Sequence, residues 1–158
     1  MERQKSKMDI DRLKLVEIYN TLNNFGRDNG MVIISLERGK VDYEMKIQEK
    51  HLATPIAAHG GILAGFMDAI LGVTGLSVSA EQKKLVSTIE FKISYFKPAL
   101  LNDVLIGKGV VENHGNRIIS TSGEIFCPER DTIIAKGSGT FNAYPFEKAG
   151  IPLTIFDQ

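Results

Sequence analysis

The sequence predicts an α+β fold in which one antiparallel sheet wraps around a long, buried central helix. Every position of the segment 62–80 except one is apolar, Gly, Ser or Thr, so a helix formed from it would be hydrophobic nearly all round. Segments with alternating polar and apolar residues follow, and the loops between the last three are short enough for antiparallel neighbours. The apolar helix is the element on which such strands would pack.

Size and charge favour one compact domain, 1–158, that binds a small molecule. The chain has 158 residues, with 19 Lys and Arg balancing 19 Asp and Glu, so net charge gives no reason to expect nucleic acid or a membrane surface as a partner. The one cysteine, Cys127, excludes an intrachain disulfide and fits a reducing cytosol, where we expect it to be a small buried residue. Because the start of the chain is charged, no signal peptide is expected, and a cytoplasmic location is predicted.

An amphipathic helix is predicted near the N-terminus, at about 9–26. Asp9 is the candidate N-cap and Gly26 the candidate stop signal. Apolar residues recur between them at helical spacing and would form the face that packs on the core: Ile10, Leu13, Val16, Leu22 and Phe25.

Two strands are predicted before the central helix and four after it. The first two flank a turn at Gly39. In the strand that ends at Lys97-Pro98, Ile89, Phe91, Ile93 and Tyr95 would share one face, and Thr88, Glu90, Lys92 and Ser94 the other. The expected ranges are strands at 31–36 and 41–47, a helix at about 59–79, strands at 104–112, 117–126 and 132–141, and a tail, 145–158, without periodicity. One sheet rolled around one buried helix is the hotdog fold.

Asp68 is the only carboxylate in the apolar segment. Burial of an unpartnered carboxylate costs several kcal/mol, so Asp68 requires a strong local partner, a perturbed pKa or a function. A purely structural alternative is that Asp68 hydrogen-bonds Thr74 or Ser77. Asp68 also argues against a membrane span, because a carboxylate at mid-span costs roughly 2.5 to 3.5 kcal/mol on insertion scales.

Several motifs together resemble the PaaI-like acyl-CoA thioesterases of the hotdog superfamily, over roughly Val41 to Phe141. These motifs are His59-Gly60-Gly61, Asp68 nine residues after the His, Thr88-Ile89-Glu90-Phe91-Lys92-Ile93 and Phe96-Lys97-Pro98-Ala99. The resemblance implies hydrolysis of an acyl-CoA or related thioester to free acid and thiol, without a metal or cofactor, by a homodimer or homotetramer. It also implies that the Gly60 N–H holds the thioester carbonyl, that Asp68 is the general base or nucleophile, and that the Thr88 hydroxyl helps to orient the attacking water.

The position of Gly60 suits this role, because the first N–H groups of a helix are unpaired and the helix dipole stabilises an oxyanion there. Gly60 and Asp68 are eight residues apart, which is about 12 Å along one helix. They cannot both contact one carbonyl, so the spacing predicts a two-fold dimer with composite sites at the subunit boundary. The spacing of His59 and Asp68 likewise argues against a metal site.

Other residues near these motifs have more than one interpretation. His59 caps or anchors the loop before the helix, or it also polarises the carbonyl. Gly61 is a candidate substrate-binding residue, and Lys97 and Arg117 either contact the phosphates of coenzyme A or are simply solvated. Two further expectations concern His51 and His114, which would lie in loops, and Gly107-Lys108-Gly109, which fits a strand rather than a phosphate-binding loop.

One departure from the family pattern affects the predicted activity. Members usually carry an Asn six residues before the His and a Gly three residues after that Asn, whereas this chain has Ala53 and Ile56. Thr54 would replace the amide donor only if the loop shifted, and loss of one oxyanion donor can cost about 100- to 1000-fold in turnover. The alternatives are therefore a noncatalytic acyl-CoA binding or sensing protein and, less favoured, a hotdog dehydratase acting on acyl thioesters.

Overall fold

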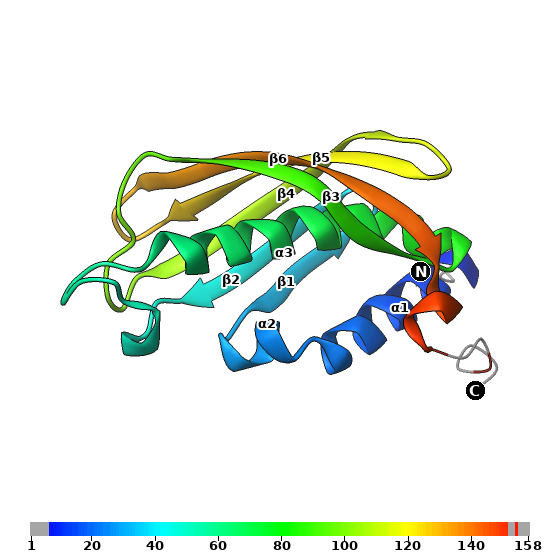
Figure 1. The fold of residues 1–158 in the computed structure, drawn as a ribbon, viewed down its shortest axis with the longest axis horizontal. Coiled ribbons are helices and arrows are strands. Elements are labelled where there is room, and N and C mark those ends of the chain that lie inside the picture. The colour runs from blue at the N-terminus through cyan, green and yellow to red at the C-terminus, as the bar shows by residue number, and fades with distance from the viewer. Residues whose placement is uncertain (1–6, 152–153, 155–158) are drawn as a thin grey trace, which may run out of the picture.

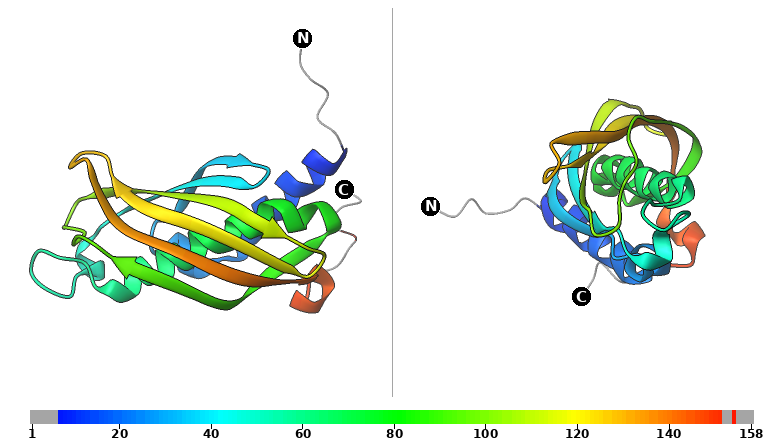
Figure 2. Two further views of the ribbon diagram at one scale, coloured as in Figure 1. Left: turned by 90° about the horizontal axis from the view of Figure 1, so that it is seen from above. Right: turned by 90° about the vertical axis from the view of Figure 1, so that its left-hand side faces the viewer.

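One six-stranded antiparallel sheet in the order β1-β2-β4-β5-β6-β3 curls around the central helix α3 (Figure 1). A computed structural model describes residues 7–151 and 154. Its main elements are α1 (Lys7–Leu22), α2 (Asn24–Asp28), β1 (Val32–Glu37), β2 (Lys40–Lys46), α3 (Gly60–Ser79), β3 (Lys84–Tyr95), β4 (Val104–His114), β5 (Ile118–Cys127) and β6 (Thr132–Pro145). This is the predicted hotdog arrangement, and the sheet encloses α3 over much of its circumference (Figure 2).

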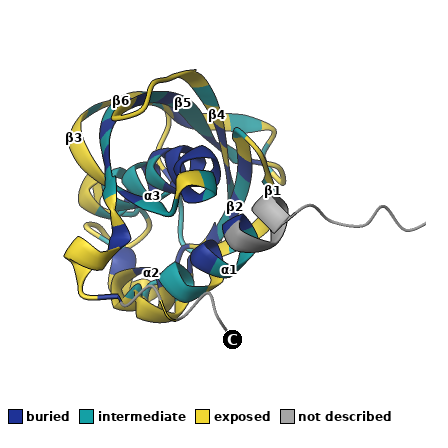
Figure 3. Ribbon diagram, turned by 90° about the vertical axis from the view of Figure 1, so that its right-hand side faces the viewer, coloured by how far each residue is buried: buried dark blue, intermediate teal, exposed yellow. Residues whose placement is uncertain are grey.

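One strand of the sheet, β3, does not lie beside the strand that follows it in the sequence. Strands β4, β5 and β6 are consecutive antiparallel neighbours, as their short loops predict. Strand β3, however, pairs with β6 instead of β4, and therefore forms one edge of the sheet. The helices α1 and α2 lie across the remaining open side, between the edges formed by β3 and β1 (Figure 3).

The inner face of α3 packs tightly on the sheet because glycines allow a close approach. A Cβ atom at Gly107 would lie 2.2 Å from Ile70 Cδ1, and one at Gly109 would lie 2.0 Å from Thr74 Oγ1. Gly107-Lys108-Gly109 is thus part of β4, as predicted. By length and composition Gly60–Gln82 also qualifies as a membrane span, but α3 contacts strands β2 to β6 in the manner of a core helix.

The N-terminal helical segment differs from the prediction at both ends. Helix α1 begins at Lys7, so Asp9 lies within it and is not its N-cap. Gly26 lies within α2 and does not stop the helix. The break falls at Asn23, whose side chain accepts the Gly26 N–H at 3.1 Å and so caps α2.

This break also changes which apolar side chains of the segment meet the core. Leu15 and Val16 are buried, whereas Leu22 is 57% exposed and Phe25 is 52% exposed. The predicted apolar stripe assumed one continuous helix, and a break at Asn23 ends its periodicity. The side chain of Ile10 lies outside the described residues.

The predicted faces of β3 are wrong at Thr88. Thr88 and Glu90 pair with adjacent residues of β6, so Ile89 is the extra residue of a β-bulge. The bulge reverses the alternation, which leaves Ile89 54% exposed and turns Thr88 to the inner face of the sheet, where Phe91 also packs.

The segment that follows the last predicted strand is more ordered than expected. The predicted tail continues β6 to Pro145 and then forms a short helix, Phe146–Ala149, in which the Phe146 side chain is fully buried. Residues 152–153 and 155–158 of the tail lie outside the described part of the chain. Cys127 is buried at the end of β5, as expected.

A buried carboxylate holds the loop that lies against the start of α3. Asp103 accepts hydrogen bonds from the Leu100 N–H at 2.8 Å and from Arg130 Nε at 3.2 Å. Burial alone would raise the pKa of Asp103, but the hydrogen bonds from Arg130 and Leu100 outweigh it and lower the pKa below its ordinary value. The same loop accepts the Ala58 N–H at the Ala99 carbonyl, at 2.8 Å.

Candidate active site

The N-terminus of α3 is capped by the His59 side chain. Its Nδ1 atom accepts the Gly61 N–H at 2.7 Å, which matches the capping interpretation of His59. Because Nδ1 is an acceptor, the proton of the neutral ring is on Nε2, where it is available to a ligand. The Gly60 N–H has no acceptor within the helix or elsewhere among the described residues, and Gly60 is exposed.

The expectation for His51 is wrong, because it is buried and structural rather than a loop residue. It lies in the short helix Glu49–His51, where its Nδ1 accepts the Gln48 N–H at 3.0 Å. Its Nε2 lies 3.1 Å from Asn29 Oδ1, and its carbonyl accepts the His59 N–H at 2.8 Å. Burial, and then the charge of Lys50, lower the pKa of His51. His114, the other expected loop histidine, is the last residue of β4.

Tyr95, at the end of β3, holds the first turn of α3 from the side. Its hydroxyl donates to the Gly60 carbonyl at 2.8 Å, and its ring atoms lie 3.6 Å from the position of a Cβ on Gly60. The sequence offered only a strand residue at this position. The contact between the strand end and the helix start becomes apparent only in the folded chain.

Asp68 lies on α3 about two turns after Gly60, and it pairs with Thr88 of β3. Thr88 Oγ1 donates to Asp68 Oδ1 at 2.8 Å. The structural alternative is wrong, since the hydroxyls of Thr74 and Ser77 donate to backbone carbonyls of Ile70 and Thr74. Asp68 is half-buried in the single chain, less than a fully buried helix would make it, and Thr88 is exposed.

Asp68 and Thr88 line a cavity of about 410 Å³ between α3, β3, β6 and the N-terminal helices. A volume in this range suits a small-molecule site. The wall is mostly apolar: Phe25, Gly65, Ala69, Gly72, Val73, Leu76, Leu85, Val86 and Phe141, with Tyr19, Asn23 and Tyr144 as further polar residues. An apolar group would therefore fit beside a carboxylate that carries one hydroxyl partner.

Tyr19 is a residue of this cavity that sequence reasoning missed. Burial, then the negative charge of Asp68, then Tyr144 raise the pKa of Tyr19 above its ordinary value. The Tyr19 phenol is therefore a protonated hydrogen-bond donor at neutral pH. No sequence pattern pointed to Tyr19 as a cavity residue, because it lies in a helix that contains both polar and apolar residues.

Gly60 and Asp68 lie apart within one chain, as their spacing predicts. Both belong to the continuous helix α3, so about 12 Å along its axis separates them. His59, Gly60 and Gly61 form one group at its start, and Asp68 with Thr88 forms another. No carbonyl can contact both groups of the same chain.

Lys97 and Arg117, the candidate phosphate ligands, lie at opposite ends of the sheet. The Lys97 N–H donates to the Ile134 carbonyl, and Arg117 Nε donates to Asn142 Oδ1 at 3.0 Å. Ile134 and Asn142 are eight residues apart on β6, or about 26 Å. The two side chains of one chain therefore cannot share a single phosphate group.

The loop that carries Ala53, where members of the family usually have Asn, is held by hydrogen bonds between its own residues. Thr54 Oγ1 accepts the Ala57 N–H at 3.0 Å, and the Ala53 N–H donates to the Ala57 carbonyl at 2.9 Å. The Thr54 oxygen thus stabilises its own turn, and Ala53 offers no side-chain donor.

An unpaired amide at the start of the central helix, and a carboxylate–hydroxyl pair in an apolar cavity, are groups that a hydrolase with the hotdog fold would use. The Thioesterase superfamily model matches residues 57–134. The human protein named acyl-coenzyme A thioesterase 13 is 27% identical over 128 residues, which are 80% of this chain and 90% of that protein. These matches show that the chain is a thioester hydrolase similar to the thioesterase superfamily.

Solved structures agree on the fold. A hypothetical thioesterase from Streptococcus pneumoniae, determined with coenzyme A, is 25% identical with a TM-score of 0.64, covering 73% of this chain and 86% of that one. The PaaI protein of the Escherichia coli phenylacetic acid degradation operon is 17% identical with a TM-score of 0.77, covering 87% of this chain and 96% of that one. The second similarity concerns the fold alone.

Proposed function

We propose that the protein hydrolyses acyl-CoA thioesters to a free acid and coenzyme A, at sites composed of two copies of the chain. The observation that carries the proposal is the Asp68–Thr88 pair, which lies in an apolar cavity and is partly open to the surface. In each site, Asp68 and Thr88 of one copy would face Gly60 of a second copy. Relatives named as acyl-CoA thioesterases, and one structure with coenzyme A, support the choice of substrate.

The reaction follows from the properties of these groups. Asp68 takes a proton from a water molecule that also contacts Thr88, and the water oxygen attacks the thioester carbonyl. The Gly60 N–H and the dipole of α3 stabilise the oxyanion that forms. When the oxyanion collapses, the C–S bond breaks, and the thiolate receives the proton held by Asp68. In a second version, Asp68 attacks the carbonyl itself and the C–S bond breaks, which releases the thiolate and leaves a mixed anhydride on Asp68. Water then cleaves the anhydride to the free acid and the Asp68 carboxylate, and the proton that this releases is taken up by the thiolate.

Self-association is proposed because a single chain leaves the site incomplete. Among the described residues, no strand pairs with the outer side of the edge strand β3, and large apolar side chains near it are exposed, including Ile89 and Phe96. Pairing through this edge would bring a second α3 beside the first. A dimer, or a dimer of dimers, is therefore part of the proposal.

The two alternatives differ from hydrolysis in measurable ways. A dehydratase would need the imidazole of His59 across from the carboxylate, but the ring caps its own helix. A binding or sensing protein is favoured by the missing donor at Ala53. Release of free thiol from a panel of acyl-CoAs supports hydrolysis, whereas binding of a nonhydrolysable analogue without release supports the sensor.

Asp68→Asn tests the proposed role directly. The amide is nearly isosteric but cannot accept a proton, so hydrolysis should fall by at least about 100-fold while analogue binding persists. Asp131→Asn is the matched control, because Asp131 is an exposed turn residue with φ of 47°, a conformation that Asn also adopts readily. Thr88→Ala should cost less than Asp68→Asn. Unchanged turnover in Asp68→Asn would remove Asp68 from the mechanism.

A further inference from the structure

We propose that the N-terminal helices α1 and α2 select the acyl group, with Phe25 as the residue that excludes substrates branched or bulky next to the carbonyl. The inference rests on the proposed function, because it assigns the cavity beside Asp68 to the acyl group. It concerns a part of the chain, 7–28, that precedes the region matched by the thioesterase family model.

The cavity lies along one face of α3. Residues 65, 68, 69, 72, 73 and 76 of α3 line it, and this spacing corresponds to a single helical stripe. From Asp68 to Leu76 the stripe extends by about 12 Å. The reacting end is at Asp68, and the far end is at Leu76, Leu85 and Tyr144.

Phe25 covers the reacting end of this cavity. A Cβ atom on Gly65 would lie 2.9 Å from Phe25 Cζ and 3.0 Å from Cε1, so the ring edge rests directly on the bare backbone of Gly65. Gly65 precedes Asp68 by about one turn of α3. Phe25 therefore limits the width of the cavity beside the carbonyl, whereas Leu85 and Tyr144 limit its length.

Two further side chains of the same segment lie in the cavity wall. Tyr19 projects from α1, and Asn23 occupies the break between α1 and α2. The break redirects the chain so that Phe25 reaches Gly65. The Tyr19 hydroxyl gives the wall a polar donor near Asp68, while the ring of Phe25 remains apolar.

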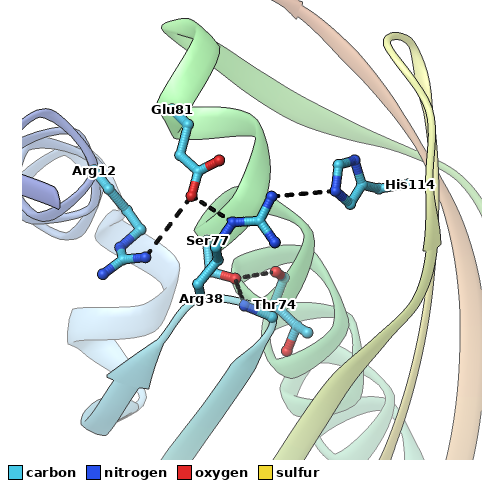
Figure 4. A network of polar contacts seen from close by, with 7 residues as sticks. Arg12, Arg38, Thr74, Ser77, Glu81 and His114 are labelled. Carbon is cyan, nitrogen blue, oxygen red and sulfur yellow. Dashed lines mark hydrogen bonds and ion pairs between the residues drawn. The ribbon is translucent and has the colours of Figure 1, made fainter. Parts of the chain in front are cut away.

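The segment is anchored to the core at the opposite end of α3. The side chains of Leu15 and Val16 pack with Leu76 and Phe146 in one buried cluster. Arg12 contacts Glu81 at 3.9 Å, and Glu81 also accepts a hydrogen bond from Arg38 Nε at 2.7 Å. Both contacts are drawn in Figure 4. Helix α1 thus runs antiparallel to α3 from a fixed end, which holds Phe25 over Gly65.

The test compares Phe25→Ala with Leu22→Ala. Leu22 is a matched control because it is a large apolar residue of the same segment with similar exposure, 57% against 52%, but it does not line the cavity. The probes are octanoyl-CoA and 2-methyloctanoyl-CoA, together with their nonhydrolysable thioether analogues. Circular dichroism first verifies that each variant folds. The measurements are then kcat/KM for the two thioesters and dissociation constants for their two analogues.

Wild-type protein and Leu22→Ala should have a higher kcat/KM for octanoyl-CoA than for 2-methyloctanoyl-CoA. Phe25→Ala should lower that preference by at least about tenfold. In an apolar pocket, one methyl group more or less on the substrate changes kcat/KM by at least about that factor. Phe25→Leu, which retains part of the side chain, should lie between them. An equal preference in Phe25→Ala and Leu22→Ala would overturn the proposal, as would analogues that fail to bind.

The analogue measurements separate this inference from the proposed function. If the wild-type protein hydrolyses no ester but Phe25→Ala still changes the relative affinity for the two analogues, hydrolysis is refuted and the selectivity role stands. If the esters are hydrolysed with a preference that Phe25→Ala leaves unchanged, the function stands and the selectivity role is refuted.

Discussion

Two inactive variants should restore activity to each other when their subunits mix. Asp68→Asn removes the proposed base, and Gly60→Pro removes the N–H that would hold the oxyanion. If each site takes Gly60 from one copy and Asp68 from another, a mixed dimer contains one site with both defects and one intact site. A composite site therefore predicts complementation, whereas a site within one chain does not.

The structure indicates that Gly60→Pro keeps the helix. Gly60 is the first residue of α3, where proline is well tolerated. His59 has φ of −65° and ψ of 137°, the extended conformation that a residue before proline adopts. A Cβ on Gly60 would lie 3.6 Å from the nearest atoms of Tyr95, an ordinary contact distance. Gly60→Ala fills similar space but retains the N–H, and is the matched control.

The expected recovery is about a quarter of wild-type activity in the unfractionated mixture and about half of it in purified mixed dimers. With statistical pairing, half of the dimers are mixed, and each of these has one intact site of two. The variants carry different affinity tags, are refolded together, and the mixed species is purified and assayed for thiol release. Circular dichroism and size-exclusion chromatography must first show that each variant folds and associates. No recovery in verified mixed dimers would refute a site shared between chains, and Gly60→Ala should remain active throughout.

Two further predictions concern groups that support the site. Tyr95→Phe removes the hydrogen bond to the Gly60 carbonyl, a loss of about 1 kcal/mol, and should lower kcat several-fold with little change in KM; an unchanged kcat in stopped-flow or steady-state assays would mean that Tyr95 does not position the oxyanion amide. Asp103→Asn should reduce the free energy of unfolding by about 1 to 3 kcal/mol at pH 7, measured by urea denaturation. Because the pKa of Asp103 is lower in the folded chain, its contribution is present above the unfolded pKa and is lost as pH falls through the folded pKa, so the difference between wild type and variant should shrink in acid; a difference independent of pH would contradict this.

The candidate site was predictable where the signal was local. A histidine followed by two glycines at a helix start indicated a capped N-terminus, and His59 indeed accepts the Gly61 N–H. Asp68 was recognisable as a candidate because it is the only carboxylate in an apolar segment of the sequence. Tyr19, Phe25 and Tyr95 could not be found in the same way, because strand and helix residues of their type are common and their contacts are with distant parts of the chain.

Most elements of this protein, and its overall architecture, follow from local patterns in the amino-acid sequence. Hydrophobic periods and turn residues act over a few positions, so they predict α3, the strands and the hotdog arrangement. Three features become apparent only in the folded chain: β3 pairs with β6, a bulge at Ile89 turns Thr88 toward Asp68, and a break at Asn23 carries Phe25 to Gly65. The physical reason is that pairing register and side-chain packing depend on which distant segments meet, and a periodic pattern does not encode the single extra residue that reverses a strand's faces.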